Sequence, residues 1–344
     1  MFHYIDKAID LAKELKLTTS HHPWEIQHGI LANGTDYKIS DPLGNEINAL
    51  DFLLRGTNVG WYPIQGGIVR EDENGYPYFI ERQKGLEADI HQNLFLGEFS
   101  TIGLDLDSTT VLTNLGNEYP LRKVLERAML YTFPEKLKES REEPSWLITS
   151  FARYLPMGLW KNIKGEEARL EDIVKYANEL ELGFGSCFGT HVMEGIAVGV
   201  IKYMEKTEIP PLKFQSPWRE AHEKLELGIN LVKKLQREDG SIPRLWFKSD
   251  PIPRNLNEFK LTIEQLIGIT LLRPREILYA TGHTLDWLVQ YLPVQILSQH
   301  WVTRAVEITA KTIAGNFYKV SKEVSPLTHA VHALKVYKDK LGNN

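Results

Sequence analysis

The stretch Gly189-Thr-His-Val-Met-Glu-Gly-Ile-Ala-Val-Gly-Val-Ile-Lys-Tyr-Met204 decides the fold class, because its apolar side chains fall on every side of a helix. A helix that is apolar all round is buried in a protein core or in a membrane. Residues 280–292 and 325–337 have the same character. No run approaches the roughly 18–20 uninterrupted apolar residues of a membrane span. We therefore expect these three segments to be buried helices of a protein core.

Helices of a second kind alternate with the buried ones. Residues 168–181, 216–237 and 295–313 each carry one apolar stripe and one charged face, which is typical of surface helices. Apolar spacing of three and four recurs along the rest of the chain. The pattern predicts twelve helices, at 2–16, 22–32, 45–56, 86–101, 118–131, 144–155, 168–181, 189–206, 216–237, 280–292, 295–313 and 325–341.

This alternation predicts an all-α fold, an (α/α)6 toroid of outer and inner helices that forms a single domain over residues 1–344. Most single cores stop growing at roughly 250–300 residues, and a closed ring of helix pairs passes that limit. Glycines and prolines break the pattern at 57–85, where we expect a small β-hairpin insert. A second irregular stretch covers residues 238–262.

Composition excludes several classes of protein. The formal net charge is −5 and no basic stripe with interleaved aromatics is present, so we expect no nucleic-acid partner. Cys187 is the only cysteine, which excludes an internal disulfide and a zinc site built of thiolates alone. The first seventeen residues, MFHYIDKAIDLAKELKL, do not read as a signal peptide. We expect a cytoplasmic protein with a small-molecule substrate, whose oligomeric state the sequence leaves undetermined.

Histidines recur near the start of the inner helices. Five of the six predicted inner helices carry one, namely His28, His91, His191, His283 and His329, and the sixth begins at Glu143-Pro-Ser145-Trp146. All inner helices of an up-down ring run the same way, so their amino-terminal ends would meet at one mouth. Each histidine taken alone is more often a hydrogen-bonded core or cap residue. Five in matching positions favour a functional pocket.

Two sets of site residues follow from this register. Imidazoles and carboxylates exchange protons near neutral pH, and large aromatic rings form apolar walls. The candidate catalytic residues are His28, His91, Glu143, His191, His283, Asp286 and His329. The candidate substrate-binding residues are Trp24, Ser145, Trp146, Trp287 and His332.

A metal ion is an open alternative. Cys187 and His191 are four residues apart, and His283 or His329 would complete a tetrahedral site of nitrogen and sulfur ligands, for which zinc is the expected ion. Against this, Cys187 stands in Gly183-Phe-Gly-Ser-Cys-Phe-Gly189, ahead of the predicted helix, and a lone buried cysteine is usually a small hydrophobe. The cofactor is therefore undetermined by the sequence.

Several segments carry a family resemblance. Those segments are His28-Gly29, Gly189-Thr-His191, Thr281-Gly-His283 with Trp287, and Leu327-Thr-His-Ala330 with His332, Leu334 and Tyr337. They resemble a bacterial family placed with the terpenoid cyclase/protein prenyltransferase α/α-toroid superfamily. Leu235-Gln-Arg-Glu-Asp-Gly240 is similar to the Gln-and-Gly repeat motif of squalene cyclases, with Ile242 in place of its Trp. The resemblance implies the ring fold and an isoprenoid or lipid substrate.

The chain departs from that superfamily in its catalytic motifs. The DxDD and DDxxD motifs of terpenoid cyclases are absent, and Asp105-Leu-Asp107-Ser108 does not replace them. Of the Asp, Cys and His that hold zinc in protein prenyltransferases, only Cys187 and His191 have counterparts. Our first hypothesis is therefore an enzyme that uses acid–base chemistry, with or without a metal, on a small organic substrate. A carbohydrate lyase or hydrolase and a non-catalytic binding toroid are the alternatives.

Overall fold

The computed structural model describes residues 1–56, 67–80, 91, 93–155, 158–244 and 273–342. The chain is mostly helical, as the sequence predicts, and the few strands are short. Among the described residues, no helix is long and apolar enough to cross a membrane. The chain divides into two compact units, one of residues 16–176 and the other of residues 1–15 with 177–344. We call them the middle unit and the terminal unit.

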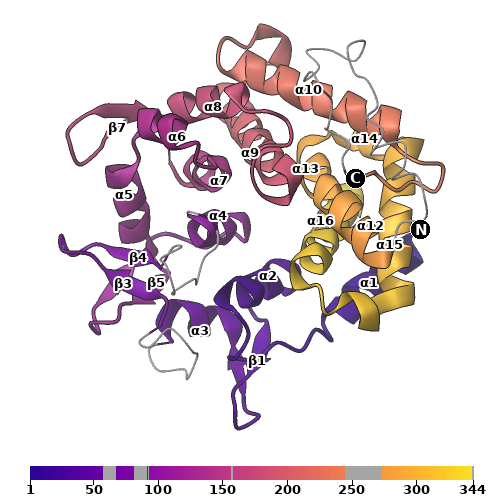
Figure 1. Ribbon diagram of the computed structural model, residues 1–344, viewed down its shortest axis with the longest axis horizontal. Coiled ribbons are helices and arrows are strands. Elements are labelled where there is room, and N and C mark those ends of the chain that lie inside the picture. Colours follow the sequence, from indigo (N-terminus) through magenta and orange to yellow (C-terminus); the bar gives the residue numbers. More distant parts are fainter. Residues whose placement is uncertain (57–66, 81–90, 92, 156–157, 245–272, 343–344) are drawn as a thin grey trace. The chain divides into compact units, whose positions relative to one another are not determined.

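Three buried helices form the core of the middle unit. They are α2 (Pro23–Asn33), α4 (Leu94–Thr101) and α7 (Ser145–Tyr154), and nearly every side of each is covered. Helices α4 and α7 lie side by side (Figure 1), and a Cβ at Gly97 would lie 2.9 Å from the Trp146 ring. The partly exposed helices of this unit are α3 (Ala49–Arg55), α5 (Leu121–Tyr131), α6 (Pro134–Ser140) and α8 (Leu170–Glu179). Residues 177–179 of α8 belong to the terminal unit.

Four β-hairpins precede or separate these helices in the described part of the chain. Their strand pairs are β1 (Lys38–Ser40) with β2 (Glu46–Asn48), β3 (Val69–Glu71) with β4 (Pro77–Phe79), β5 (Thr110–Leu112) with β6 (Glu118–Pro120), and β7 (Leu159–Lys161) with β8 (Glu167–Arg169). In each hairpin turn, the backbone carbonyl of a polar residue accepts a hydrogen bond from the amide of a glycine three positions later in the sequence. Asp41 and Gly44 form one such pair. Those glycines have positive φ, which other residues rarely adopt.

The hairpins correct the predicted helix boundaries. Residues 46–48, 118–120 and 167–169 are strands, so helices predicted from 45, 118 and 168 begin at Ala49, Leu121 and Leu170. The hairpin expected within 57–85 is confirmed by β3 and β4, while residues 57–66 and 81–85 lie outside the described residues. Residues 86–90 of the helix predicted at 86–101 and residues 245–262 of the second irregular stretch also lie outside them. Within the described residues that helix begins at Leu94, so His91 lies ahead of it and not in its first turn.

The terminal unit is built around three adjoining buried helices. Helix α13 (His283–Tyr291) packs against both α9 (Thr190–Thr207) and α16 (Val324–Gly342), as Figure 1 shows. Its other helices are α1 (Phe2–Ala12), α10 (Trp218–Leu235), α12 (Pro274–Ile277), α14 (Val294–Leu297) and α15 (His300–Val320), with 3₁₀ turns η1 (Ser186–Gly189) and η2 (Pro211–Lys213) and a π-helical turn η3 (Leu278–Gly282).

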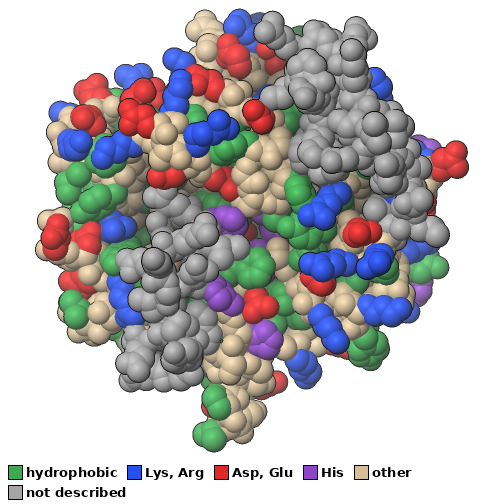
Figure 2. All heavy atoms as spheres, in the orientation of Figure 1, with side chains coloured by type: hydrophobic (Ala, Val, Ile, Leu, Met, Phe, Trp, Pro, Cys, Tyr) green, Lys and Arg blue, Asp and Glu red, His purple; other side chains and the backbone are tan. Residues whose placement is uncertain are grey.

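The predicted alternation of helix type is present in the burial of the side chains. Helices α2, α4, α7, α9, α13 and α16 are buried nearly all round, whereas α1, α3, α5, α8, α10 and α15 each bury one stripe. On the face drawn in Figure 2, basic and acidic side chains are interspersed over both units. This mixture agrees with the formal net charge of −5.

Candidate metal centre

A strained turn places the first two residues of the site. Cys187 (φ 48°) and Phe188 (φ 60°) both have left-handed backbone in η1, immediately before α9. Non-glycine residues in this conformation cost about 1–2 kcal/mol each, and such strain is concentrated at functional sites. Gly189 ends the turn at φ 78°, where a Cβ would lie 2.0 Å from the Leu182 carbonyl oxygen. The turn brings the Cys187 thiol beside His191, the second residue of α9.

A second irregular turn places His283. The π-helical turn η3 runs directly into α13, and His283 is the first residue of that helix. Single π turns are rare and are frequent at functional sites. Gly282 lets α13 approach α16, because a Cβ there would lie 2.8 Å from the Ala330 Cβ atom. The imidazole of His329, next to Ala330, therefore lies close to that of His283.

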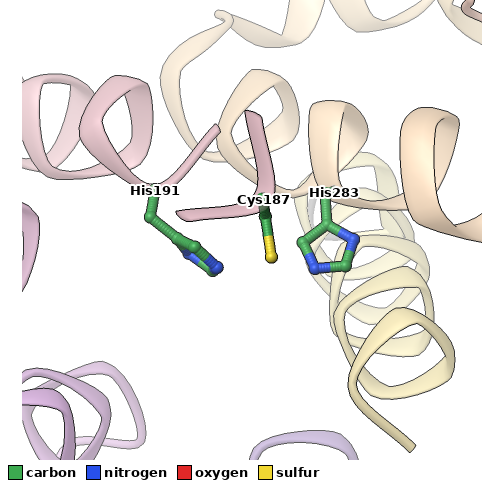
Figure 3. A group of neighbouring side chains, drawn as sticks. All are labelled: Cys187, His191 and His283. Atoms are coloured by element: carbon green, nitrogen blue, oxygen red, sulfur yellow. The ribbon is translucent and has the colours of Figure 1, made fainter. Parts of the chain in front are cut away.

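Three side chains of the terminal unit form a group that fits a metal ion. One ligand atom each of Cys187, His191 and His283 lie within 4.8 Å of one another, and the side chains point toward one another (Figure 3). Ligand atoms of a tetrahedral zinc centre lie about 3.4–3.6 Å apart, given Zn–S of about 2.3 Å and Zn–N of about 2.0–2.1 Å. Small side-chain movements would therefore close this group around an ion.

Burial supports a metal-ligating role for these side chains. His191 is 4% exposed and His283 is 2% exposed. Within the described part of the chain, neither ring nitrogen of His283 makes a hydrogen bond. Buried polar atoms are nearly always satisfied, and one without a partner indicates a missing ion, water or ligand. A metal ion beside Cys187 would satisfy this ring.

The ionisation of the group also suits a metal. Burial would raise the pKa of the Cys187 thiol, but the His283 and His191 rings outweigh burial and hold that pKa well below its ordinary value. Burial would lower the pKa of His191, but the sulfur and the Glu194 carboxylate raise it well above its ordinary value. Both directions favour the thiolate, the form that binds metals, beside an imidazolium whose proton an ion would displace.

Two carboxylates, those of Asp286 and Glu194, contact imidazoles in and beside the possible metal site. The Nδ1 atoms of His329 and His332 lie 2.7 Å and 2.6 Å from the two carboxylate oxygens of Asp286. His191 Nδ1 lies 3.5 Å from Glu194 Oε2. The Glu194 carboxylate also accepts from Gln290 at 3.1 Å. Such carboxylate–imidazole contacts fix the ring orientation and raise the basicity of metal ligands.

His329 lies beside the group of possible ligands. Its ring centroid lies 5.0 Å from that of His191 and 4.4 Å from that of His283. Burial, followed by the two neighbouring rings, holds the pKa of His329 well below its ordinary value, so the imidazole is neutral. Because Nδ1 faces Asp286, the Nε2 edge of the ring is turned away from that carboxylate. One atom each of Glu194, Asp286 and His329 also lie within 4.8 Å of one another.

The structure brings several predicted site residues together within each unit. In the terminal unit, His191, His283, Asp286, His329 and His332 form one network. Trp287 is fully buried in the core of the same unit. Of the predicted helix positions, His191 and His283 are confirmed in the first turn, whereas His329 is the sixth residue of α16 and lies in its second turn.

The remaining predicted residues belong to the middle unit. Ser145 Oγ donates to Glu143 Oε1 at 2.7 Å, and His91 Nδ1 lies 4.0 Å from Glu143 Oε2. The Trp146 ring lies 6.5 Å from that of His91. His28, in the second turn of α2, donates from Nδ1 to the Trp24 carbonyl oxygen at 2.7 Å. The convergence of all five histidines on one mouth stays a prediction.

Sequence reasoning missed Glu194 and Tyr279. Glu194 follows His191 by three residues, the same spacing that separates Asp286 from His283 and His332 from His329. This repeated spacing on three buried helices was a signal for Glu194, since residues three apart share a helix face. The Tyr279 hydroxyl lies 3.9 Å from the Cys187 sulfur, and burial, followed by the thiolate, raises the pKa of Tyr279 to about 12. Only the fold places it there.

Comparisons of the chain with family models, with curated proteins and with solved structures found no match.

Proposed function

We propose that the protein is a metal-dependent enzyme in which Cys187, His191 and His283 bind one zinc ion. The observation that carries the proposal is the approach of their three ligand atoms to within 4.8 Å of one another. The unsatisfied ring of His283 within the described part of the chain supports the same conclusion. One thiolate and two imidazoles are a ligand set that zinc favours.

Three protein ligands favour catalysis over a structural role. Structural zinc sites are usually closed by four protein ligands, whereas catalytic sites keep the fourth position for water or substrate. Zinc lowers the pKa of a bound water to about 7 and polarises carbonyl oxygens. With zinc bound, His329, whose ring Asp286 holds, would be the residue that exchanges a proton at that position. We therefore propose water- or proton-transfer chemistry on a small organic substrate.

The (α/α)6 toroid is part of the proposal. Six helices that are buried nearly all round alternate with six that bury one stripe, which supports outer and inner layers of a ring. In the motif similar to that of squalene cyclases, Gln236 Nε2 donates to the carbonyl oxygens of Gly240 and Trp301 at 3.0 Å and 2.7 Å. This ties the start of the 236–244 segment to helix α15. The family resemblance favours an isoprenoid or lipid substrate.

Metal content tests the proposal. Protein purified without a tag is analysed by plasma mass spectrometry, wild type beside His283→Ala and Cys187→Ala. His300→Ala, at an exposed position at the start of α15, is the matched control. We expect close to one zinc per chain in the wild type and the control, and loss of the ion in both site variants, with melting temperatures confirming that they fold. A metal-free wild type, or an unchanged zinc content in His283→Ala, would contradict the proposal.

A further inference from the structure

An exposed arginine stands over the turn that carries the thiol ligand. The Arg244 guanidinium carbon lies 4.2 Å from the Phe188 ring centroid and 5.5 Å from that of Tyr279. The two rings meet edge to face, with centroids 5.5 Å apart. Phe188 adjoins Cys187 in the strained turn, and the Tyr279 hydroxyl contacts the sulfur. The rim formed by Arg244, Phe188 and Tyr279, which we call the arginine rim, therefore borders the proposed metal site.

The backbone that leads to Arg244 is held in place. The Ile242 amide donates to Thr281 Oγ1 at 3.0 Å, and both residues are fully buried. Gly240 has φ 91°, and a Cβ there would lie 2.4 Å from the Arg304 carbonyl oxygen. These contacts fix residues 240–242 against η3 and α15, so the position of Arg244 above the two rings is set by the fold.

The charge of Arg244 is not neutralised by an acidic side chain in the part of the chain that the structure describes. Arg275 also lies close enough to lower the pKa of Tyr279, as Arg244 does, but the charge of Arg275 is paired with a carboxylate. Its Nε atom lies 3.1 Å from Glu323 Oε2. A guanidinium stacked on aromatic rings keeps its N–H edge available, and that edge matches a carboxylate through two parallel hydrogen bonds.

We propose that the arginine rim binds the carboxylate of the substrate, with Arg244 as the residue that determines this specificity. The proposal rests on the proposed function, because the rim is defined by its position beside the metal ligands. A single guanidinium balances the single charge of a carboxylate. A phosphate dianion would bring a second negative charge toward a site that already holds the Glu194 and Asp286 carboxylates. The substrate class is therefore a small carboxylic acid whose other end reaches the metal.

Binding of 4-fluorobenzoate, followed by ¹⁹F NMR, tests the inference without a turnover assay. Wild type, Arg244→Met and Arg244→Lys are compared, each both zinc-loaded and stripped with a chelator. Arg275→Met is the matched control, since it removes the same charge from the same neighbourhood. The neutral amide 4-fluorobenzamide and inorganic phosphate, added as a competitor, report on the chemistry that is recognised.

We expect Arg244→Met to raise the dissociation constant for 4-fluorobenzoate about tenfold, with Arg244→Lys between it and wild type. Arg275→Met should have little effect, and binding of the amide should not depend on Arg244. Equal losses in the two methionine variants, no binding to wild type, or tighter binding of phosphate than of the carboxylate would overturn the inference. Dependence on Arg244 in both zinc-loaded and stripped protein would uphold it even where metal analysis disproves the zinc site.

Discussion

His329 on α16 and Asp286 on α13 are joined by a contact of 2.7 Å between Nδ1 and Oδ2 in the buried core of the terminal unit. His332, one turn along α16, meets the other oxygen of the same carboxylate at 2.6 Å. One buried carboxylate thus fixes two imidazoles, and the ring of one of them, His329, lies beside the two rings that we assign to the metal. The strength of this bridge is measurable.

Replacing Asp286 by Ala should lower the free energy of unfolding by about 1–3 kcal/mol, because the buried imidazole of His329 and the part-buried imidazole of His332 lose their acceptor. Asp286→Asn retains one acceptor oxygen, so it should lower the free energy of unfolding by less than Asp286→Ala does. Urea unfolding measures both. Asp6→Ala, at an exposed ion pair with Lys338, is the control and should change stability by less than about 1 kcal/mol. An Asp286→Ala protein as stable as wild type would show that the bridge does not hold α13 to α16.

The close approach of α13 to α16 predicts opposite effects for two glycines. Gly282→Ala places a Cβ 2.8 Å from the Ala330 Cβ atom, so it should destabilise the protein by about 1–3 kcal/mol. Gly315→Ala, in α15, meets no atom within 4 Å among the described residues and should stabilise it by about 0.5–1 kcal/mol. Thermal and urea unfolding measure both, and equal effects of the same sign would contradict this packing.

The conformation of the turn before α9 predicts that a substitution at Gly189 removes the metal although all three ligand residues are kept. Gly189→Ala requires a Cβ at φ 78° that would lie 2.0 Å from the Leu182 carbonyl oxygen, so the turn must rebuild and Cys187 must move. We expect zinc content to fall although Cys187, His191 and His283 are all present. Gly165→Ala, at φ 78° in a β-hairpin turn of the middle unit, is the control for backbone strain and should leave zinc content unchanged. Full zinc in Gly189→Ala would contradict this account of the turn.

A buried lysine gives a pH prediction. Lys224 donates from α10 to the carbonyl oxygens of Ala177, Asn178 and Leu180 near the end of α8, and burial lowers its pKa to about 7. Between pH 7 and about 10.4, the ordinary lysine pKa, the unfolded chain therefore binds more protons at this residue than the folded chain. The free energy of unfolding of wild type should rise with pH relative to Lys224→Met. Parallel stability curves from pH 7 to 10 would contradict the lowered pKa.

The buried helices were predictable because their signal is long and simple. Residues 190–200 of α9 are buried without interruption, and this matches the all-round apolar pattern of the sequence. The hairpins were not predictable in the same way. Strands of three residues are shorter than the window in which periodicity is read, so residues 46–48 and 118–120 were merged with the helices that follow them. The local sequence signal of each hairpin is a polar residue three positions before the glycine of its turn.

The site was predictable only in part. His191 and His283 were placed at the starts of two buried helices by counting from the apolar pattern, and Asp286 followed from its spacing. The left-handed backbone at Cys187 and Phe188 has no local sequence signal, since neither residue type favours positive φ. Arg244 and Tyr279 are 35 positions apart in the sequence, so only the tertiary structure brings them together at one rim.

X-ray absorption at the zinc edge tests the central claim most directly. Zinc-loaded wild type should show one sulfur at about 2.3 Å and nitrogen or oxygen ligands at about 2.0–2.1 Å. The sulfur shell should disappear in Cys187→Ala, since this is the only cysteine of the chain. A wild-type spectrum with nitrogen and oxygen ligands alone, or a protein that takes up no zinc, would contradict a centre built from Cys187, His191 and His283.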